Sequence, residues 1–181
     1  MPGLVDAHVH VCAVTADLSA LAEWSPTYVA ARAGTVMRGM LRRGFTTVRD
    51  VAGADYGLAE AVEEGYLEGP RLVFGGKALS QTGGHGDHRH RGRDVEHFCY
   101  CSPALNRVCD GVAEVRRAAR DEIRKGARHL KLMLSGGVAS PADRIDSAQF
   151  SIEEIRAAVE GGWPPAALTS AMQVTSCCSA E

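Results

Sequence analysis

The stretch GLVDAHVHV, residues 3–11, decides the first element of the fold. Polarity alternates along it, and a period of two residues predicts a β-strand. One face carries Val5, Ala7, Val9 and Val11, and the other carries Leu4, Asp6, His8 and His10. The two histidines therefore lie on the same face, at the carboxyl end of the strand.

Strands and helices alternate along the chain that follows. Apolar residues at helical spacing predict helices, and β-branched runs bounded by glycine or proline predict strands. The expected elements are a helix over 26–43, a strand over 44–51, a helix over 58–69, a strand over 70–76, a helix over 111–125, a strand over 127–134 and a helix over 151–160. Residues 77–108 show no clear periodicity and predict a long loop, a kind of segment that is usually functional or disordered. This order predicts an α/β protein with a parallel sheet, and catalysis at the carboxyl ends of its strands.

Composition and charge exclude several classes of function. The 181 residues carry a formal net charge of −2, which predicts no attraction to nucleic acid or to an anionic membrane surface. No apolar run is long enough to span a bilayer, and the N-terminus lacks the pattern of a signal peptide. These features favour a cytoplasmic protein.

The cysteines do not form a recognisable framework. Six are present: Cys12, Cys99, Cys101, Cys109, Cys177 and Cys178. Their spacing fits neither a disulfide pattern nor a paired zinc site, and it predicts reduced thiols. Cys99 and Cys101 beside His97 leave open an adventitious metal site, but no fourth ligand has suitable spacing.

Two features carry metal chemistry. His8 and His10 are separated by a rise of about 6.6 Å along a strand, so both imidazoles can converge on one ion just beyond it. Lys131, in HLKLML, lies on the strand face opposite Leu130 and Leu132. A buried lysine favours the neutral amine, which can take up carbon dioxide to form a metal-bridging carbamate. The alternatives are chance polar residues on a half-buried strand, and a lysine that reaches solvent at the strand end.

Four stretches in order resemble the amidohydrolase superfamily: PGLVDAHVHV, GFTTVRDV, GPRLVFGGKALSQTGGHGD and HLKLMLSGGVASP. The resemblance runs through residues 1 to about 160 and is closest to the imidazolonepropionase-like and Xaa-Pro dipeptidase-like branch. It implies a (β/α)₈ TIM-type barrel with one or two divalent metal ions, usually zinc. It also implies hydrolysis of an amide-like C–N bond in a small-molecule or dipeptide-like substrate by a metal-activated water.

The resemblance assigns roles to particular residues. His8 and His10 match metal ligands of the first strand, and Lys131 matches a carboxylated lysine that bridges two metals. His85, in TGGHGD, matches a substrate-binding loop histidine. The neighbouring His88, His90 and His97 match no role and are expected to be exposed loop histidines.

The sequence also departs from the family pattern. The last histidine is His129, so the histidines of strands five and six and the general-base aspartate of strand eight have no counterpart. A (β/α)₈ barrel takes about 250 residues, and about the first four βα units are expected here, over 1–160, as an unclosed half-barrel. Residues 161–181 change abruptly in composition, predict no fifth strand and are interpreted as an aberrant, disordered or frameshifted tail.

Three functional hypotheses follow. The first is a metal-dependent amidohydrolase whose N-terminal part is this chain, inactive alone. The second is a non-catalytic half-barrel that associates through its open sheet edges. The third is a small zinc module on the histidine-rich loop 85–97.

Overall fold

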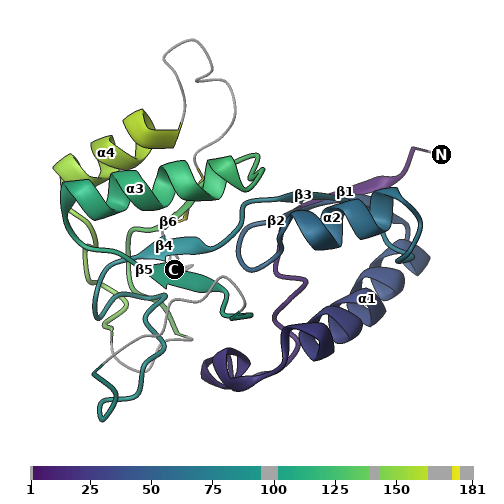
Figure 1. Ribbon diagram of the computed structural model, residues 1–181, viewed down its shortest axis with the longest axis horizontal. Helices are drawn as coiled ribbons and strands as arrows, with labels where there is room; N and C mark the ends of the chain where they lie inside the picture. Colours follow the sequence, from purple (N-terminus) through teal and green to yellow (C-terminus); the bar gives the residue numbers. More distant parts are fainter. Residues whose placement is uncertain (1, 95–101, 139–142, 163–172, 176–181) are drawn as a thin grey trace.

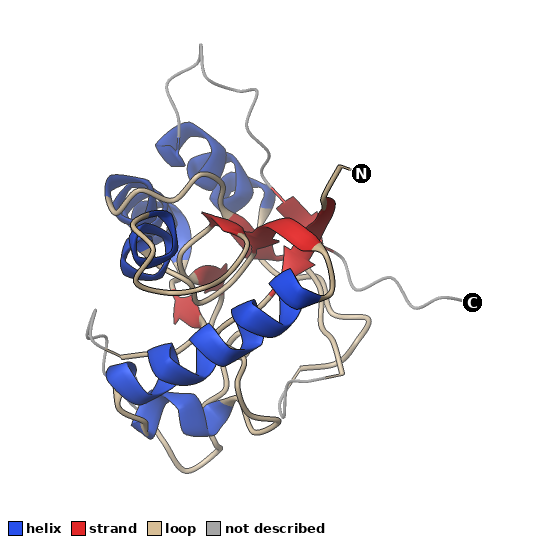
Figure 2. Cartoon of the chain, turned by 90° about the vertical axis from the view of Figure 1, so that its right-hand side faces the viewer, coloured by secondary structure: helices blue, strands red, loops and turns tan. Residues whose placement is uncertain are grey.

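The fold alternates strands and helices in a computed structural model that describes residues 2–94, 102–138, 143–162 and 173–175. Figure 1 shows the order of the elements, and in Figure 2 the strands lie between helices. The elements are β1 (Leu4–Val9), a 3₁₀ helix (Ser19–Glu23), α1 (Pro26–Arg42), β2 (Phe45–Asp50), α2 (Tyr56–Glu63), β3 (Arg71–Phe74), β4 (Ala78–Ser80), β5 (Asn106–Val108), α3 (Gly111–Arg124), β6 (Lys131–Met133), α4 (Ile152–Gly162) and β7 (Gln173–Thr175). In these described parts no helix is both long and apolar enough to cross a bilayer.

All pairs of named strands are parallel. One sheet has the order β1-β2-β3 and the other the order β5-β4-β6-β7. Backbone hydrogen bonds join them where the chain passes from β3 to β4: Gly75 donates to Asp50, Gly53 donates to Gly76, and Arg128 donates to the carbonyl of Phe74. The strands therefore follow one curved course that does not close, which confirms the predicted α/β fold with a partial barrel architecture.

The helix ends follow the local sequence. Gly44 and Gly126, which come after α1 and α3, have φ values of 92° and 98°, a conformation that glycine adopts without steric cost. At the start of α4, Ser151 N–H donates to the Glu154 carboxylate (2.7 Å), and Glu154 N–H donates to the Ser151 hydroxyl (3.3 Å). This reciprocal pair is the capping box that the sequence predicts.

Two expectations about strands are wrong. The segment 77–108, expected to be a loop, contains the three-residue strands β4 and β5, and the tail, expected to offer no strand, contains β7 paired with β6. Three residues are too few for a periodic pattern, so pairing with distant strands decides these elements. The rest of the tail lies outside the described residues.

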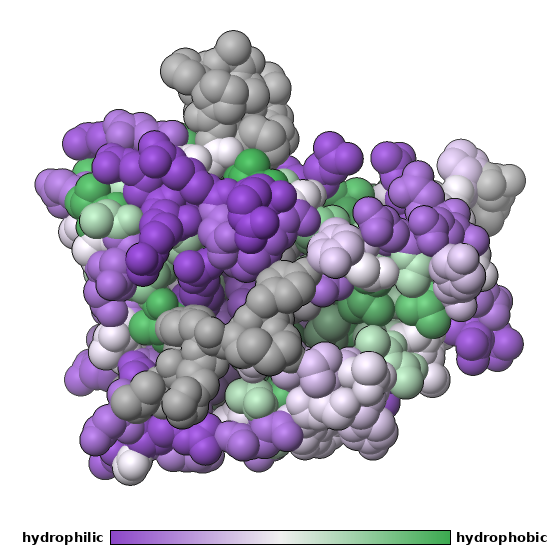
Figure 3. Space-filling model, in the orientation of Figure 1, coloured by the Kyte–Doolittle hydropathy of each residue, from purple (hydrophilic) through white to green (hydrophobic). Residues whose placement is uncertain are grey.

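Two apolar clusters hold the layers together. In one, Val29, Ala33 and Met37 of α1 pack toward Val9 and Val48 of the sheet. In the other, Val115 and Ala119 of α3 pack with Leu79, Leu132 and, from α4, Ala158. Figure 3 shows hydrophilic residues over α3 and α4, and hydrophobic residues reaching the surface around α1 and α2.

Candidate functional site

His8 and His10 lie together at the carboxyl end of β1. Their ring centroids are 5.3 Å apart at an interplanar angle of 68°. His8 is exposed and His10 is half-buried, and Nδ1 of His10 is 3.4 Å from the carbonyl oxygen of Ala52. A proton on Nδ1 directed at this carbonyl leaves the Nε2 lone pair for another partner.

Lys131 lies near both histidines. It is the first residue of β6 and is only 4% exposed. Burial, followed by the charge of Lys131, lowers the pKa of His8. Burial is also the largest cause that lowers the pKa of His10 to about 4, with smaller contributions from His8 and Lys131. Both imidazoles are therefore neutral at pH 7, which is the form that binds metals.

The chemistry of these three side chains suits a divalent metal ion. Two neutral imidazoles supply nitrogen ligands of the type that zinc prefers, and a buried lysine stands beside them. Within the described ranges, no group of three or more His, Cys, Asp and Glu side chains could hold an ion. The arrangement thus brings together the predicted nitrogen donors, and their role as ligands stays a prediction.

Asp50 fixes the backbone next to His10. The sequence analysis did not single it out. Its side chain is fully buried and accepts hydrogen bonds from the backbone N–H of Val11 (2.6 Å), Ala52 (3.1 Å) and Ala54 (3.2 Å). Burial raises the pKa of Asp50 to about 7, against these hydrogen bonds. An acidic residue on the same strand face as the apolar Val48, at the end of β2, was the available signal.

His129 is the second site residue that the sequence analysis did not single out. It lies two residues before Lys131 and is 2% exposed. Burial, followed by the charge of Arg49, lowers the pKa of His129 to about 4. The ring packs against Gly75, where a Cβ would be 2.6 Å from Nε2. The alternation that singled out Lys131 also places His129 on the same strand face.

His85 lies in the loop after β4, against the loop after β6. Its Nδ1 is 3.5 Å from Oδ2 of Asp143, and its backbone N–H donates to Oε1 of Gln149 at 2.9 Å. The structure does not give it a place among the nitrogen donors around Lys131, and its substrate-binding role stays a prediction.

The other loop histidines differ from one another. His90 is exposed as expected, with Nε2 3.3 Å from the Ser19 hydroxyl oxygen. His88 is half-buried, and burial followed by the charge of His85 lowers its pKa, so its predicted exposure is wrong. His97 lies outside the described residues.

Cys12 and Cys109 are buried free thiols, as expected. Burial raises the pKa of both and, for Cys109, to about 12. The other four cysteines lie outside the described residues.

A parallel sheet that does not close, with two histidines at the carboxyl end of β1 and a buried lysine in β6, is part of a (β/α)₈ hydrolase barrel. The profile of the Amidohydrolase family matches residues 1–177, and the chain belongs to that family.

Solved structures and a curated enzyme support the same relationship. A prolidase complexed with N-methylphosphonate-L-proline is 52% identical, with a TM-score of 0.86 over 89% of this chain and 40% of that one. A Xaa-Pro dipeptidase with methionine bound in its active site is 32% identical, with a TM-score of 0.71 over 88% of this chain and 40% of that one. Ochratoxinase of Aspergillus niger is 37% identical over 172 residues, 88% of this chain and 36% of the enzyme. The chain thus spans well under half the length of these relatives, and the predicted family resemblance is confirmed.

The family match extends beyond residue 160, where the sequence alone placed the end of the resemblance. Strand β7 also lies in that last part and pairs with β6. Both findings favour a segment that continues the fold. The frameshift interpretation of 161–181 stays a prediction, which sequencing the gene through codon 160 and translating all three frames would decide.

Proposed function

We propose that this chain carries the first part of a metal-dependent amidohydrolase that cleaves amide-like C–N bonds in dipeptide-like substrates. The observation that carries the proposal is that His8 and His10, at the carboxyl end of β1, lie close to the buried Lys131 of β6. The prolidase and the Xaa-Pro dipeptidase, which hold methylphosphonate-proline and methionine, support a small dipeptide-like ligand.

Each of the three residues has a distinct part in this proposal. His8 and His10 would hold one or two zinc ions through neutral imidazole nitrogens, and Asp50 would keep the backbone of His10 in place. The Lys131 amine would attack the carbon of carbon dioxide and lose a proton, and the resulting carbamate would offer two oxygen ligands. A bound zinc ion would supply Lewis-acid chemistry, polarising the substrate carbonyl and activating a water molecule.

The chain by itself is proposed to be inactive. Metal-assisted hydrolysis needs a group that accepts the proton of the water and delivers it to the leaving nitrogen. The described residues at the site supply nitrogen donors, and the sequence offers no counterpart of the family's general-base aspartate. We expect no turnover of a Xaa-Pro dipeptide or an N-acyl amino acid with added zinc. Turnover that His10→Ala abolishes would contradict this expectation.

Zinc titration of the purified chain tests the metal site without reference to activity. Calorimetry should show binding that His8→Ala and His10→Ala each weaken roughly tenfold or more, because each removes a ligand. His90→Ala is the matched control, since this exposed histidine lies in the loop after β4. If His85→Ala and Cys99→Ala abolished binding while His8→Ala did not, the site would instead be the histidine-rich loop.

A second candidate is a non-catalytic half-barrel that associates through its sheet edge. The observation that favours it is β1, which carries Leu4 and Val5 with 53% and 67% of their surfaces exposed. In the described part of the chain β1 pairs with β2 alone. An edge strand with exposed apolar side chains is a template for pairing with another chain. A discrete dimer in light scattering would support this candidate, and a monomer or a polydisperse aggregate would contradict it.

A cytoplasmic location is also proposed. The buried thiols of Cys12 and Cys109 are free, as in a reducing compartment. Cell fractionation with an antibody against the chain tests it, and recovery in the secreted fraction would contradict it.

A further inference from the structure

The loop after β6 forms a seat for the imidazole of His85. Three residues of this loop make the seat: Gly137 faces the ring, Asp143 approaches Nδ1, and Gln149 binds the backbone of His85. The ring is 21% exposed, so most of its surface is enclosed. The metal site as proposed above uses none of the three.

Asp143 is the polar wall of this seat. Its side chain is 1% exposed. Oδ2 accepts hydrogen bonds from Gly137 N–H and from the Gln149 amide nitrogen, both at 3.1 Å. Oδ1 and the Nδ1 atom of His85 are buried, and neither has a hydrogen-bond partner among the described residues. A buried carboxylate is costly unless it is paired, so the ring nitrogen 3.5 Å away is the natural partner.

Gln149 ties the two groups to each other. Its amide oxygen accepts the His85 backbone N–H, and its amide nitrogen donates to Asp143, which settles the orientation of the amide. The side chain is 2% exposed and also donates to the Ser147 hydroxyl at 3.1 Å. The carboxylate and the histidine backbone are therefore held at a set separation, with Nδ1 of the ring 3.5 Å from Oδ2.

We propose that Asp143, held by Gln149, is a positioning residue. Its carboxylate accepts a hydrogen bond from the Nδ1–H of His85 and so leaves the Nε2 atom of the ring to face a ligand. The hydrogen bond at one imidazole nitrogen selects the tautomer and leaves the other nitrogen for chemistry. The inference rests on the proposed function in one respect only, the identity of the ligand. That ligand would be the polar end of a dipeptide-like substrate. The orientation of the ring stands on the contacts of this chain.

The tautomer can be read directly from the full chain. Long-range ¹H–¹⁵N spectra of histidine-labelled protein, recorded at a pH where the rings are neutral, distinguish an Nδ1–H ring from an Nε2–H ring. We expect His85, assigned by the signal that His85→Asn removes, to show the Nδ1–H pattern. A wild-type His85 with its proton on Nε2 would overturn the proposal, and this result needs no folded variant.

Variants then test the role of the carboxylate. Asp143→Asn should shift His85 toward the Nε2–H form, whereas Asp143→Glu should restore part of the Nδ1–H pattern. The spectrum of the exposed His90 should not change in either variant. A folded Asp143→Asn protein with an unaltered His85 pattern would also overturn the proposal. A failure of the wild-type chain to bind zinc would count against the proposed function alone, since zinc does not enter this measurement.

Discussion

The ring of His85 occupies the space that a side chain at Gly137 would need. A Cβ built on Gly137 would lie 2.8 Å from Nε2 and 2.9 Å from Nδ1 of that ring, and it would also contact Cε1. Cβ atoms do not approach ring atoms so closely. His85 can therefore occupy this position only because residue 137, the second glycine of the SGG loop, has no side chain. A loop that follows β4 and a loop that follows β6 thus share one packed contact.

Gly137→Ala should displace the ring of His85. The new methyl group forces the ring away from Asp143, and we expect the Nδ1–H signature to disappear, with a loss of stability of about 1–3 kcal/mol. Long-range ¹H–¹⁵N spectra and urea unfolding measure the two effects. Gly92→Ala is the control, because a Cβ at Gly92 meets nothing within 4 Å. An unchanged His85 spectrum in Gly137→Ala would contradict this close packing.

Glu122→Ala should destabilise the fold by about 2–3 kcal/mol, because it removes charged hydrogen bonds from a buried position. Glu122 is 2% exposed and accepts from the backbone N–H of Lys77 (3.2 Å) and from Nζ of Lys125 (3.1 Å). It therefore ties α3 to the chain between β3 and β4. Urea unfolding followed by circular dichroism measures the change in the free energy of unfolding.

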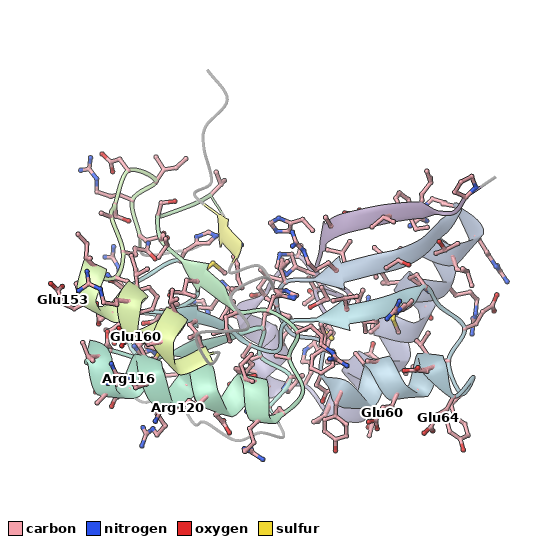
Figure 4. All side chains as sticks on the ribbon, turned by 90° about the horizontal axis from the view of Figure 1, so that it is seen from above. Glu60, Glu64, Arg116, Arg120, Glu153 and Glu160 are labelled. Carbon is pink, nitrogen blue, oxygen red and sulfur yellow. The ribbon has the colours of Figure 1, made fainter. Side chains whose placement is uncertain are left out.

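A surface ion pair between α3 and α4 provides the comparison for Glu122. Arg116 of α3 and Glu160 of α4, labelled in Figure 4, are 3.2 Å apart, with 35% and 57% of their side chains exposed. Glu160→Ala should cost no more than about 1 kcal/mol, because solvent screens an exposed pair. Equal losses of stability in Glu122→Ala and Glu160→Ala would show that burial does not decide how much a charged residue contributes to the free energy of unfolding.

Asp87→Asn should change the dependence of stability on pH. Burial by itself raises the pKa of Asp87, but hydrogen bonds from Arg89 (2.6 and 2.7 Å) and from Gly83 N–H (2.9 Å) outweigh it and hold the pKa below its usual value. The ionised form therefore stabilises the folded chain, and that contribution is complete above about pH 4, the pKa of an unfolded aspartate, and is lost as the pH falls through the lower folded value.

The measurement is urea unfolding of the wild type and of Asp87→Asn between neutral pH and about pH 3. The difference between the two free energies of unfolding should be about 1.5–3 kcal/mol at neutral pH and should shrink below about pH 4. Other titrating groups are the same in both proteins and cancel in the difference. A difference that grew on acidification would show that the pKa of Asp87 is shifted in the opposite direction.

Val5→Lys should reduce self-association of the chain. Val5 is 67% exposed on β1, and a lysine on an edge strand opposes pairing with another strand. Sedimentation velocity at several concentrations should show a smaller associated fraction than in the wild type. Tyr66→Lys is the control, since Tyr66 is 80% exposed but follows α2 and is not part of β1. Equal effects of the two substitutions would point to general surface charge rather than to the edge.

Local patterns were sufficient for most of the elements. The alternation in residues 3–11 predicts β1 and places His8 and His10 on one face, because a strand turns successive side chains to opposite sides. The capping box at Ser151 and Glu154 needs only residues three apart, and it marks the start of α4. The family resemblance supplied the predicted metal role of Lys131 and the barrel architecture, which strand pattern alone does not define.

The sequence by itself thus determined the alternation of strands and helices and the parallel sheet, since these depend on neighbours in the chain, and it predicted a metal role for His8 and His10. Only the tertiary structure decided β4, β5 and β7, whose three residues carry no period and which form by pairing with distant strands. It alone brought Gln149 to His85, 64 residues away, and enclosed Asp143 and Asp50. Burial and hydrogen bonding between remote segments depend on how the chain packs, so no local sequence pattern predicts them.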